Sequence, residues 1–417
     1  MKRAWLFVLA WLAFPAVSAQ NPAPQDLQQV YVTLPMNALS SDSAVNSAEA
    51  TAPAPAGNAG TGTTIPFWKY TMVAYDGKSY NGAIVGRNPF NHGARTTNVP
   101  VVLIPVQIAF QTSTGTFSWD PTTADPDCLG APPNNVPLTL TSQSPVLVPQ
   151  DFSFGSVDMG ITTYPDANQR GQFWQNVQLT GNSYHVAFNP VTTAPVQTAS
   201  FVTGGLDAQI YTGFSTCGAS TGFVNRAGLF GVVSKTSWDS VARGLISSLG
   251  IQPTQFPIFL FYNVVMSNGP PASNLSNCCI LGYHDSYTRS ISNPGQTYGV
   301  ADFEDRGVFS GISDVSVLSH EVQEWMNNPG LLNFTPPWGH IGQVSLCQNT
   351  LEEGDPLTGT LLPAINGANG FSYHVQEIPW FSWYFAGTGA SLGVNNWFSS
   401  NNTFKGGALP CPPGGTN

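Results

Sequence analysis

The amino-acid sequence predicts an α+β protein, with a mainly-β domain over residues 65–200 followed by an α+β domain over residues 201–417. Short runs of β-branched and aromatic residues, separated by connections rich in Gly and Pro, fill the first region. The second region also contains apolar residues at helical spacing, over 234–250 and 314–330. Two domains are expected because about 400 residues exceed the size of a typical single core.

Residues 1–19 have the pattern of a secretory signal peptide. Basic residues at 2 and 3 precede an apolar run over 4–14, and small residues at 17–19 suit cleavage after Ala19. The apolar run is too short to span a bilayer comfortably, although a short membrane anchor is the alternative. We therefore expect a secreted protein, extracellular or periplasmic, with no membrane span after cleavage.

The segment over residues 20–64 is expected to be a low-complexity linker. Residues 36–64 are rich in Ala, Ser, Thr, Gly and Pro and contain no aromatic residue. Such a composition buries too little apolar surface to offset the entropy that is lost on ordering.

The whole chain contains few charges, and acidic residues outnumber basic ones. Charged residues make up 9% of the sequence, and the formal net charge is −10. Nucleic-acid binding requires a basic surface that neutralises phosphates, and the sequence contains no cluster of Lys or Arg. Nucleic acid is therefore excluded as a partner.

The sequence contains six cysteines, which after export are expected to form up to three disulfides. The adjacent Cys278 and Cys279 are expected to pair with separate partners. Zinc–thiolate binding is the alternative, but the sequence has no C-x-x-C pair. The six cysteines are Cys128, Cys217, Cys278, Cys279, Cys347 and Cys411.

The expected strands of the first region begin with a hairpin over residues 67–86, because an Asp-Gly turn joins two β-rich runs. A long apolar run follows over residues 99–110. Its two prolines predict an edge or bulged strand, since proline cannot donate a hydrogen bond to a neighbouring strand. A polar-to-aromatic segment over residues 166–174 is expected to form a short helix.

In the second region, residues 234–250 are predicted to form a helix with Gly250 after its last turn. Residues 256–267 are predicted to form a buried strand. The next helix is expected to begin after Asp314, a favourable N-cap, and to end at the helix-breaking run 327–330. Its apolar stripe is expected to comprise Val315, Leu318, Val322 and Trp325.

This last helix contains the string H-E-x-x-E. His320 and Glu324 are one helical turn apart on one face, so a single metal ion can be bound by both side chains. Glu321 lies about 100° round the helix from His320, where a carboxylate reaches a metal-bound water and takes its proton. The alternative is a surface helix with solvated charges, which fits poorly with a sequence that avoids charge elsewhere.

Residues 347–359 contain the densest acidic cluster of the chain, with Glu352, Glu353 and Asp355. The spacing of Glu352 and Asp355 suits one further metal ligand and one residue that orients a ligand. An acidic turn exposed to water is the alternative.

The string LSHEVQEWMNNP, followed by Asn333 and Trp338 and then by LEEGDP, resembles a family of exported zincin-like proteins. The family includes the plant phosphate-induced (EXORDIUM-like) proteins and secreted bacterial proteins. Its members share S-H-E-x-x-E, a turn ending in Pro, then Asn and Trp, and then E-x-G-D. The GYH string that ends at His284 is also similar to a segment of some members. The resemblance covers residues 278–359, and a proline-containing insert at 335–337 departs from it.

The resemblance implies a zincin-like metallopeptidase domain in which His320 and Glu324 bind zinc and Glu321 is the base. Glu352 or Asp355 is the implied further ligand. A site with one His and two carboxylates is harder than the usual zinc site, so Mn²⁺ and Ca²⁺ compete with Zn²⁺.

Three other histidines are candidates for roles at this site. His284 restores a nitrogen ligand if its segment lies over the helix, and a loop or substrate contact is the alternative. His374 is a candidate donor to the oxyanion of a tetrahedral intermediate. His340 lies in the insert and is a competing ligand.

These observations favour a secreted metal-dependent hydrolase, and within that class a zinc metallopeptidase that acts on a peptide or cell-envelope substrate. In this interpretation Glu321 activates a metal-bound water, while Glu352 completes the ligand set and Asp355 orients a ligand. The alternative is a non-catalytic zincin-like binding protein that acts at the cell envelope, with a structural metal or none.

Overall fold

A computed structural model of the protein describes residues 64–90, 95–125, 128–129, 135–180, 184–212, 229–271, 275–385, 391–408 and 411. Within these residues the fold combines helices and strands, with strands predominating, so the predicted α+β class is confirmed. The predicted signal peptide over 1–19 and the predicted linker over 20–64, apart from Thr64, lie outside the described residues. In the described part of the chain, no helix is long and apolar enough to cross a membrane.

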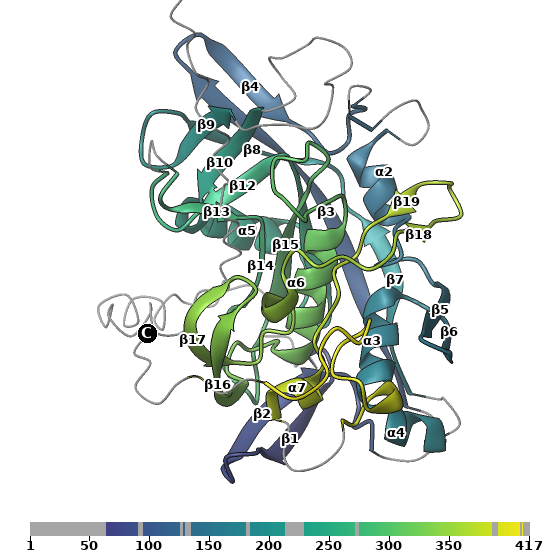
Figure 1. Ribbon diagram of the computed structural model, residues 1–417. Helices are drawn as coiled ribbons and strands as arrows, with labels where there is room; N and C mark the ends of the chain where they lie inside the picture. Colours follow the sequence, from purple (N-terminus) through teal and green to yellow (C-terminus); the bar gives the residue numbers. More distant parts are fainter. Residues whose placement is uncertain are drawn as a thin grey trace, which may run out of the picture.

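A seven-stranded sheet forms the centre of the molecule (Figure 1). Five strands follow the order β14-β15-β11-β3-β4, and β7 and β8 also pair with β3. The pairs among β15, β11, β3, β7 and β8 are parallel, whereas β14 and β4 are antiparallel to their neighbours. The strands are β3 (Arg95–Thr112), β4 (Gly115–Trp119), β7 (Tyr184–Thr193), β8 (Gln197–Val202), β11 (Phe256–Tyr262), β14 (Gly282–Ser286) and β15 (Thr297–Phe303).

Strand β3 lies inside this sheet, so the expectation of an edge strand over residues 99–110 was wrong, although the expected irregularity is present. Pro100 lies at a register shift in the pairing with β7. Pro105 lies where β3 changes its partner from β7 to β8. Both prolines therefore fall where the ladder is interrupted, and a missing N–H donor is tolerated there.

Smaller sheets surround the central one. A four-stranded sheet has the order β13-β12-β10-β9, and four hairpins complete the set. The hairpin predicted over residues 67–86 is confirmed as β1–β2. These strands are β1 (Phe67–Val73), β2 (Ser79–Val85), β5 (Gln150–Phe154), β6 (Val157–Thr162), β9 (Ala208–Thr212), β10 (Leu229–Ser234), β12 (Val264–Ser267), β13 (Cys278–Ile280), β16 (Phe334–Ile341), β17 (Val344–Thr350), β18 (Ile365–Asn366) and β19 (Ser372–Tyr373).

The buried strand predicted over residues 256–267 is divided in two. Asn263 has a positive φ of 51°, and this residue separates β11 from β12. The two strands belong to different sheets, so a continuous apolar run in the sequence links two layers of the fold.

The helices include both that were predicted outside the H-E-x-x-E segment. The segment 166–174 forms α3, and the segment 234–250 forms α5, after which Gly250 has a φ of 66°. The helices are α2 (Pro137–Ser142), α3 (Tyr164–Gln172), α4 (Trp174–Val177), α5 (Lys235–Ser248), α6 (Ser316–Asn327) and α7 (Phe381–Phe385), with 3-10 turns at Gln178–Thr180, Asp355–Leu357 and Val394–Asn396.

The predicted domain boundary at residue 200 lies inside β8. Strands from both sides of this position belong to the central sheet, because β3 pairs with β11 in parallel. The regions 65–200 and 201–417 therefore share one sheet.

Two disulfides join described cysteines. Cys347 on β17 is bonded to Cys411, with an S–S distance of 2.07 Å. Cys278 and Cys279 are bonded to each other, with Cα atoms 3.0 Å apart, so the expectation of separate partners was wrong. Cys347 and Cys411, two of the candidate partners, are bonded to one another. Cys128 is also disulfide-bonded, and Cys217 lies outside the described residues.

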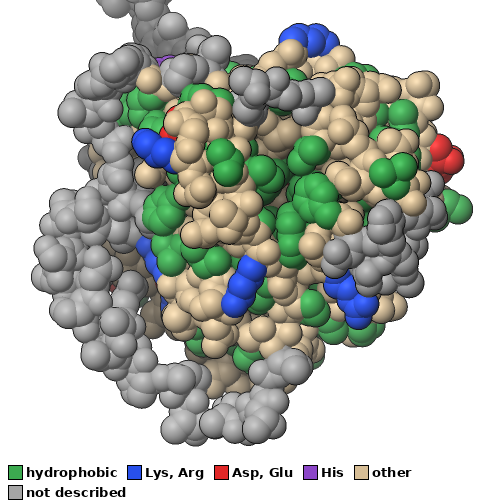
Figure 2. All heavy atoms as spheres, turned by 90° about the horizontal axis from the view of Figure 1, so that it is seen from below, with side chains coloured by type: hydrophobic (Ala, Val, Ile, Leu, Met, Phe, Trp, Pro, Cys, Tyr) green, Lys and Arg blue, Asp and Glu red, His purple; other side chains and the backbone are tan. Residues whose placement is uncertain are grey.

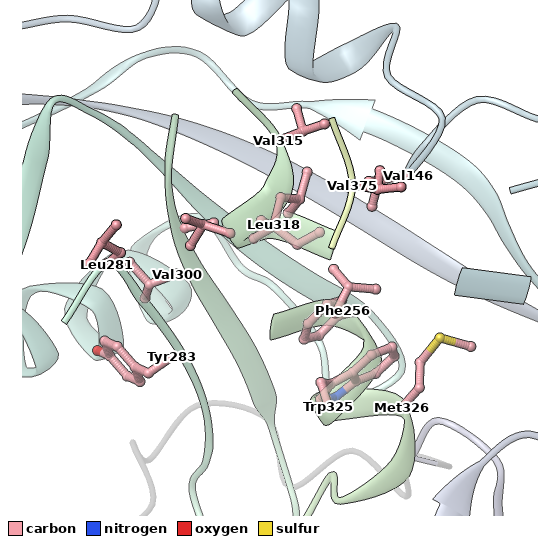
Figure 3. Packing of buried hydrophobic residues seen from close by; sticks show 14 of the residues in the cluster. Val146, Phe256, Leu281, Tyr283, Val300, Val315, Leu318, Trp325, Met326 and Val375 are labelled. Carbon is pink, nitrogen blue, oxygen red and sulfur yellow. The ribbon is translucent and has the colours of Figure 1, made fainter. Parts of the chain in front are cut away.

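Helix α6 packs against the central sheet. Trp325 stacks on Phe256 of β11, with ring centroids 3.6 Å apart (Figure 3). Its indole N–H donates to Thr297 Oγ1 of β15 at 2.9 Å. The predicted stripe is buried in full, with Val315, Leu318, Val322 and Trp325 each at most 2% exposed. This packing fixes the position of the polar side chains that α6 presents to β14.

The surface contains few charged side chains. Figure 2 shows one face of the molecule, on which Lys and Arg are scattered singly among hydrophobic and uncharged side chains. This face therefore has no basic patch of the kind that nucleic acids require.

Candidate metal centre

The polar residues of α6 lie inside the protein. Every residue from Ser316 to Asn327 is buried, so the alternative of a surface helix with solvated charges does not hold. The predicted N-cap was wrong by one residue, because Val315 is the N-cap. The carboxylate of Asp314 instead accepts hydrogen bonds from the backbone N–H groups of Val315 and His374.

Three elements bring two histidines and four carboxylates together. Helix α6 contributes His320, Glu321 and Glu324, β14 contributes His284, and the segment after β17 contributes Glu352 and Asp355. All six residues are at most 3% exposed. The acidic segment is therefore buried against α6, and the alternative of a solvated acidic turn does not hold either.

Two glycines allow this close approach. A Cβ at Gly354 would lie 2.4 Å from Nδ1 and Cε1 of His320. A Cβ at Gly282 would lie 2.7 Å from Cγ of Glu321. Side chains at these positions would displace the groups of the cluster, so glycine is required at both.

The Asn and Trp of the family-like motif position the acidic segment. Asn333 donates from Nδ2 to the carbonyl of Asn327 at 2.5 Å, and its own carbonyl accepts from the N–H of Leu351 at 2.8 Å. Trp338 donates from Nε1 to the carbonyl of Thr350 at 2.8 Å. These bonds join the C-terminal end of α6 to the residues that precede Glu352.

The imidazole of His320 has a defined tautomer. Gln376 donates from Nε2 to the carbonyl of Gly354 at 2.6 Å, so its Oε1, which lies 3.1 Å from His320 Nδ1, is the acceptor for that nitrogen. Nε2 therefore points into the cluster, and in the neutral imidazole this nitrogen carries the lone pair. There it lies 3.1 Å from Glu324 Oε1, 3.7 Å from Asp355 Oδ1 and 4.0 Å from Glu321 Oε1.

His284 has the opposite tautomer for a similar reason. Its Nε2 donates to the carbonyl of Asn328 at 3.2 Å. Its Nδ1 therefore faces Glu324 Oε2 at 3.6 Å and Glu321 Oε2 at 3.7 Å. These distances exceed the range of a hydrogen bond, and Nδ1 has no hydrogen-bond partner among the described residues.

Two carboxylate oxygens, like His284 Nδ1, are buried without a hydrogen-bond partner within the described part of the chain. They are Glu321 Oε2 and Glu352 Oε2. Glu321 Oε2 lies 3.7 Å from His284 Nδ1, and Glu352 Oε2 lies 3.9 Å from His284 Nε2, so two buried carboxylates flank this imidazole beyond hydrogen-bond range. Burying such groups is costly unless a cation lies among them.

Further amide side chains support the carboxylates. Asn328 donates from Nδ2 to Glu352 Oε1 at 2.9 Å. Gln343 and Gln348 donate to the two oxygens of Asp355, the second at 2.8 Å. Sequence reasoning missed these residues and Gln376, because it considered only side chains that bind metal directly. Asn328 was noted in the sequence only as part of the helix-breaking run that ends α6, and not as a partner of Glu352.

The pKa values of His320 and Glu352 are both raised in the cluster. Burial would lower the pKa of His320, but the carboxylates of Glu324, Glu321 and Asp355 raise it to about 10. Burial raises the pKa of Glu352, and the charge of Glu324 raises it further. Neighbouring carboxylates contribute to both shifts, so the cluster favours the uptake of positive charge.

Other predicted residues lie elsewhere. His374 pairs with Asp314 at 2.6 Å, before the start of α6, and is half-buried. His340 is exposed and lies beside the disulfide of Cys347. Glu353 accepts from Asn327 at 2.6 Å and from Gln323 at 3.2 Å. The structure therefore brings together His320, Glu321, Glu324, Glu352, Asp355 and His284, but not His374.

The comparisons with known proteins do not assign the chain to a class. No protein-family model, curated protein or solved structure matches it. The six clustered residues and their hydrogen bonds are therefore the basis for a functional proposal.

Proposed function

We propose that this protein is a secreted metal-dependent hydrolase, and within that class a zinc metallopeptidase with a zincin-like domain. One observation supports this above the others. Each of the two histidines donates its outer N–H to a protein oxygen, which turns its inner nitrogen toward buried carboxylates. This pairing of an imidazole with a fixed outer acceptor is typical of metal-binding histidines.

The donor atoms fit a divalent cation. Ligands arranged tetrahedrally at about 2.0–2.1 Å from zinc lie roughly 3.3 Å apart, and the distances from His320 Nε2 to Glu324 and Asp355 are 3.1 and 3.7 Å. Imidazole and carboxylate ligands suit Zn²⁺, and the high carboxylate content also favours Mn²⁺ or Ca²⁺. His320 and Glu324 would bind the ion, with Asp355, Glu352 and His284 adjacent.

The chain's own residues supply the rest of the chemistry. A bound divalent ion polarises a carbonyl and makes a nearby water more acidic. Glu321 is the proton acceptor in this proposal, because its carboxylate faces both imidazoles and its Oε2 is not engaged by any described donor. The substrate class is a peptide, either free or part of the cell envelope.

Metal analysis and one variant test the proposal. We expect the purified protein to contain stoichiometric metal. Glu321→Gln should retain that metal and lose about 100-fold or more of the hydrolytic rate on a peptide library, because an amide cannot accept the proton. Absence of metal, together with equal hydrolysis by the wild type and Glu321→Gln, would refute the proposal.

The complete burial of the centre favours a second candidate, a non-catalytic zincin-like binding protein with a structural metal. The side chains of His284, His320 and Glu324 are fully buried, whereas an enzyme must admit its substrate. In this case a chelator should lower the melting temperature of the wild type. Glu321→Gln would then have no effect on function, since neither protein would hydrolyse any peptide of the library.

A further inference from the structure

Two glutamates of α6 each face both histidines. Glu324 directs Oε1 toward His320 Nε2 at 3.1 Å and Oε2 toward His284 Nδ1 at 3.6 Å. Glu321 does the same with Oε1 at 4.0 Å and Oε2 at 3.7 Å. A carboxylate with one oxygen toward each of two nitrogen ligands has the geometry of a bridge between two cations.

The two histidines do not share one ligand set. Ligand atoms within 4.8 Å of one another form the set His284, Glu324 and Glu352 and the set His320, Glu321 and Glu324. No such set among the described residues contains both histidines. Two ligands of one ion lie at most roughly 4.2 Å apart, twice the bond length, so one ion does not reach both imidazoles in this arrangement.

We propose that the centre binds two divalent cations, with Glu324 as the bridging ligand. His320 binds the first ion, and His284 and Glu352 bind the second. The inference rests on the proposed function, because the first ion is the one assigned there. Two-metal sites have ions about 3.5–4 Å apart, a separation that one carboxylate spans.

The distribution of charge supports two ions over one. Glu321 and Glu352 have no Lys or Arg within ion-pair distance among the described residues. A single divalent ion offsets two of the four carboxylates and leaves the other two without a counter-charge. Two divalent ions balance all four carboxylates while both imidazoles are neutral.

The competing explanation is that His284 is a protonated imidazolium, paired with Glu321 and Glu324. A proton on Nδ1 would need an acceptor within hydrogen-bond range. The two carboxylate oxygens that it faces lie 3.6 and 3.7 Å away. These separations suit two ligands on either side of an ion better than a donor and its acceptor.

Metal stoichiometry tests the proposal without an activity assay. The full-length protein would be stripped with a chelator, loaded with Mn²⁺ alone and dialysed, and its metal content measured by mass spectrometry. We expect two Mn²⁺ per chain and the electron paramagnetic resonance signal of an exchange-coupled pair. His284→Ala and His320→Ala should each retain one ion with an uncoupled signal, and Glu324→Ala should lose both. His340→Ala is the matched control, because His340 is exposed beside a disulfide, and it should retain two.

The outcomes separate this inference from the proposed function. One uncoupled Mn²⁺ in the wild type would overturn the second ion and leave the proposed hydrolase intact. No Mn²⁺ in the wild type would overturn both. If a variant does not fold, the stoichiometry and the coupled signal of the wild type decide the question alone.

Discussion

At the scale of single residues, Gln376 determines which nitrogen of His320 is available to a metal. Its amide is itself oriented by the carbonyl of Gly354, so the proton on His320 Nδ1 has one acceptor. An imidazole whose outer nitrogen is bonded in this way keeps its orientation and is a better ligand. The same reasoning applies to Asn328, whose carbonyl fixes His284.

The first prediction is that Gln376→Leu lowers metal affinity about 10–100-fold, because His320 loses its acceptor. The affinity would be measured by competition with a chromogenic chelator. Gln175→Leu is the matched control, since Gln175 is half-buried and bonds Ser391 and Asn396, away from the centre. Equal affinity in wild type and Gln376→Leu would show that the amide does not orient the ligand.

The sequence was sufficient to predict His320, Glu321 and Glu324 because helical periodicity alone places them on neighbouring faces of one helix. Glu352 and Asp355 were predictable from the rarity of charge in the chain. The amide residues were not, because an Asn or Gln in a sequence gives no sign of which way its dipole points. That direction depends on tertiary contacts such as Gln376 with Gly354.

At the scale of elements, the fit between α6 and the acidic segment depends on Gly354. The second prediction is that Gly354→Ala lowers metal affinity and stability together, because its Cβ would lie 2.4 Å from the His320 ring and would displace it from Gln376. Thermal unfolding with and without metal would measure both effects. A loss of about 2 kcal/mol or more is expected, typical of an overpacked core.

The control for this variant is Gly244→Ala in α5. A Cβ at Gly244 meets nothing within 4 Å, and alanine favours a helix over glycine by roughly 1 kcal/mol. This variant should therefore be slightly more stable than the wild type, with unchanged metal affinity. If Gly354→Ala behaved like Gly244→Ala, neither metal affinity nor stability would depend on the close packing of residue 354 against His320.

The positions of strands and helices along the chain were predicted better than the pairing of strands in the sheets. The hairpin over 67–86 and the helix over 234–250 follow from local turn and periodicity signals. The central position of β3 does not, because it depends on pairing with β7, β8 and β11, which lie far along the chain. A proline in a strand indicates an interruption of the ladder, and only the fold shows whether that interruption lies at an edge.

At the scale of the whole molecule, the chain has few charged residues, so its buried carboxyl groups contribute strongly to the pH dependence of its stability. Near the end of β15, Glu304 accepts hydrogen bonds from the backbone N–H groups of residues 306–308, each at 3.1 Å. Burial nevertheless raises its pKa to about 8, with a further contribution from the charge of Asp305. Burial also raises the pKa of Asp305, to about 6.

The last prediction concerns the pH dependence of stability. Because the pKa of Glu304 is about 8 in the folded state and about 4.3 in an unfolded chain, the folded protein binds more protons between these values. The free energy of unfolding should therefore be highest below about pH 4.3 for this group and fall by up to about 1.4 kcal/mol per pH unit as the pH rises toward 8. Glu304→Gln removes the titrating carboxyl group, so the free energy of unfolding of this variant should fall less steeply over this range. Denaturant unfolding of both proteins at several pH values, in the same metal-loaded state, measures the difference in slope. Parallel curves for the two proteins would mean that Glu304 is already ionised in the folded state, held by the three backbone donors against the cost of burial.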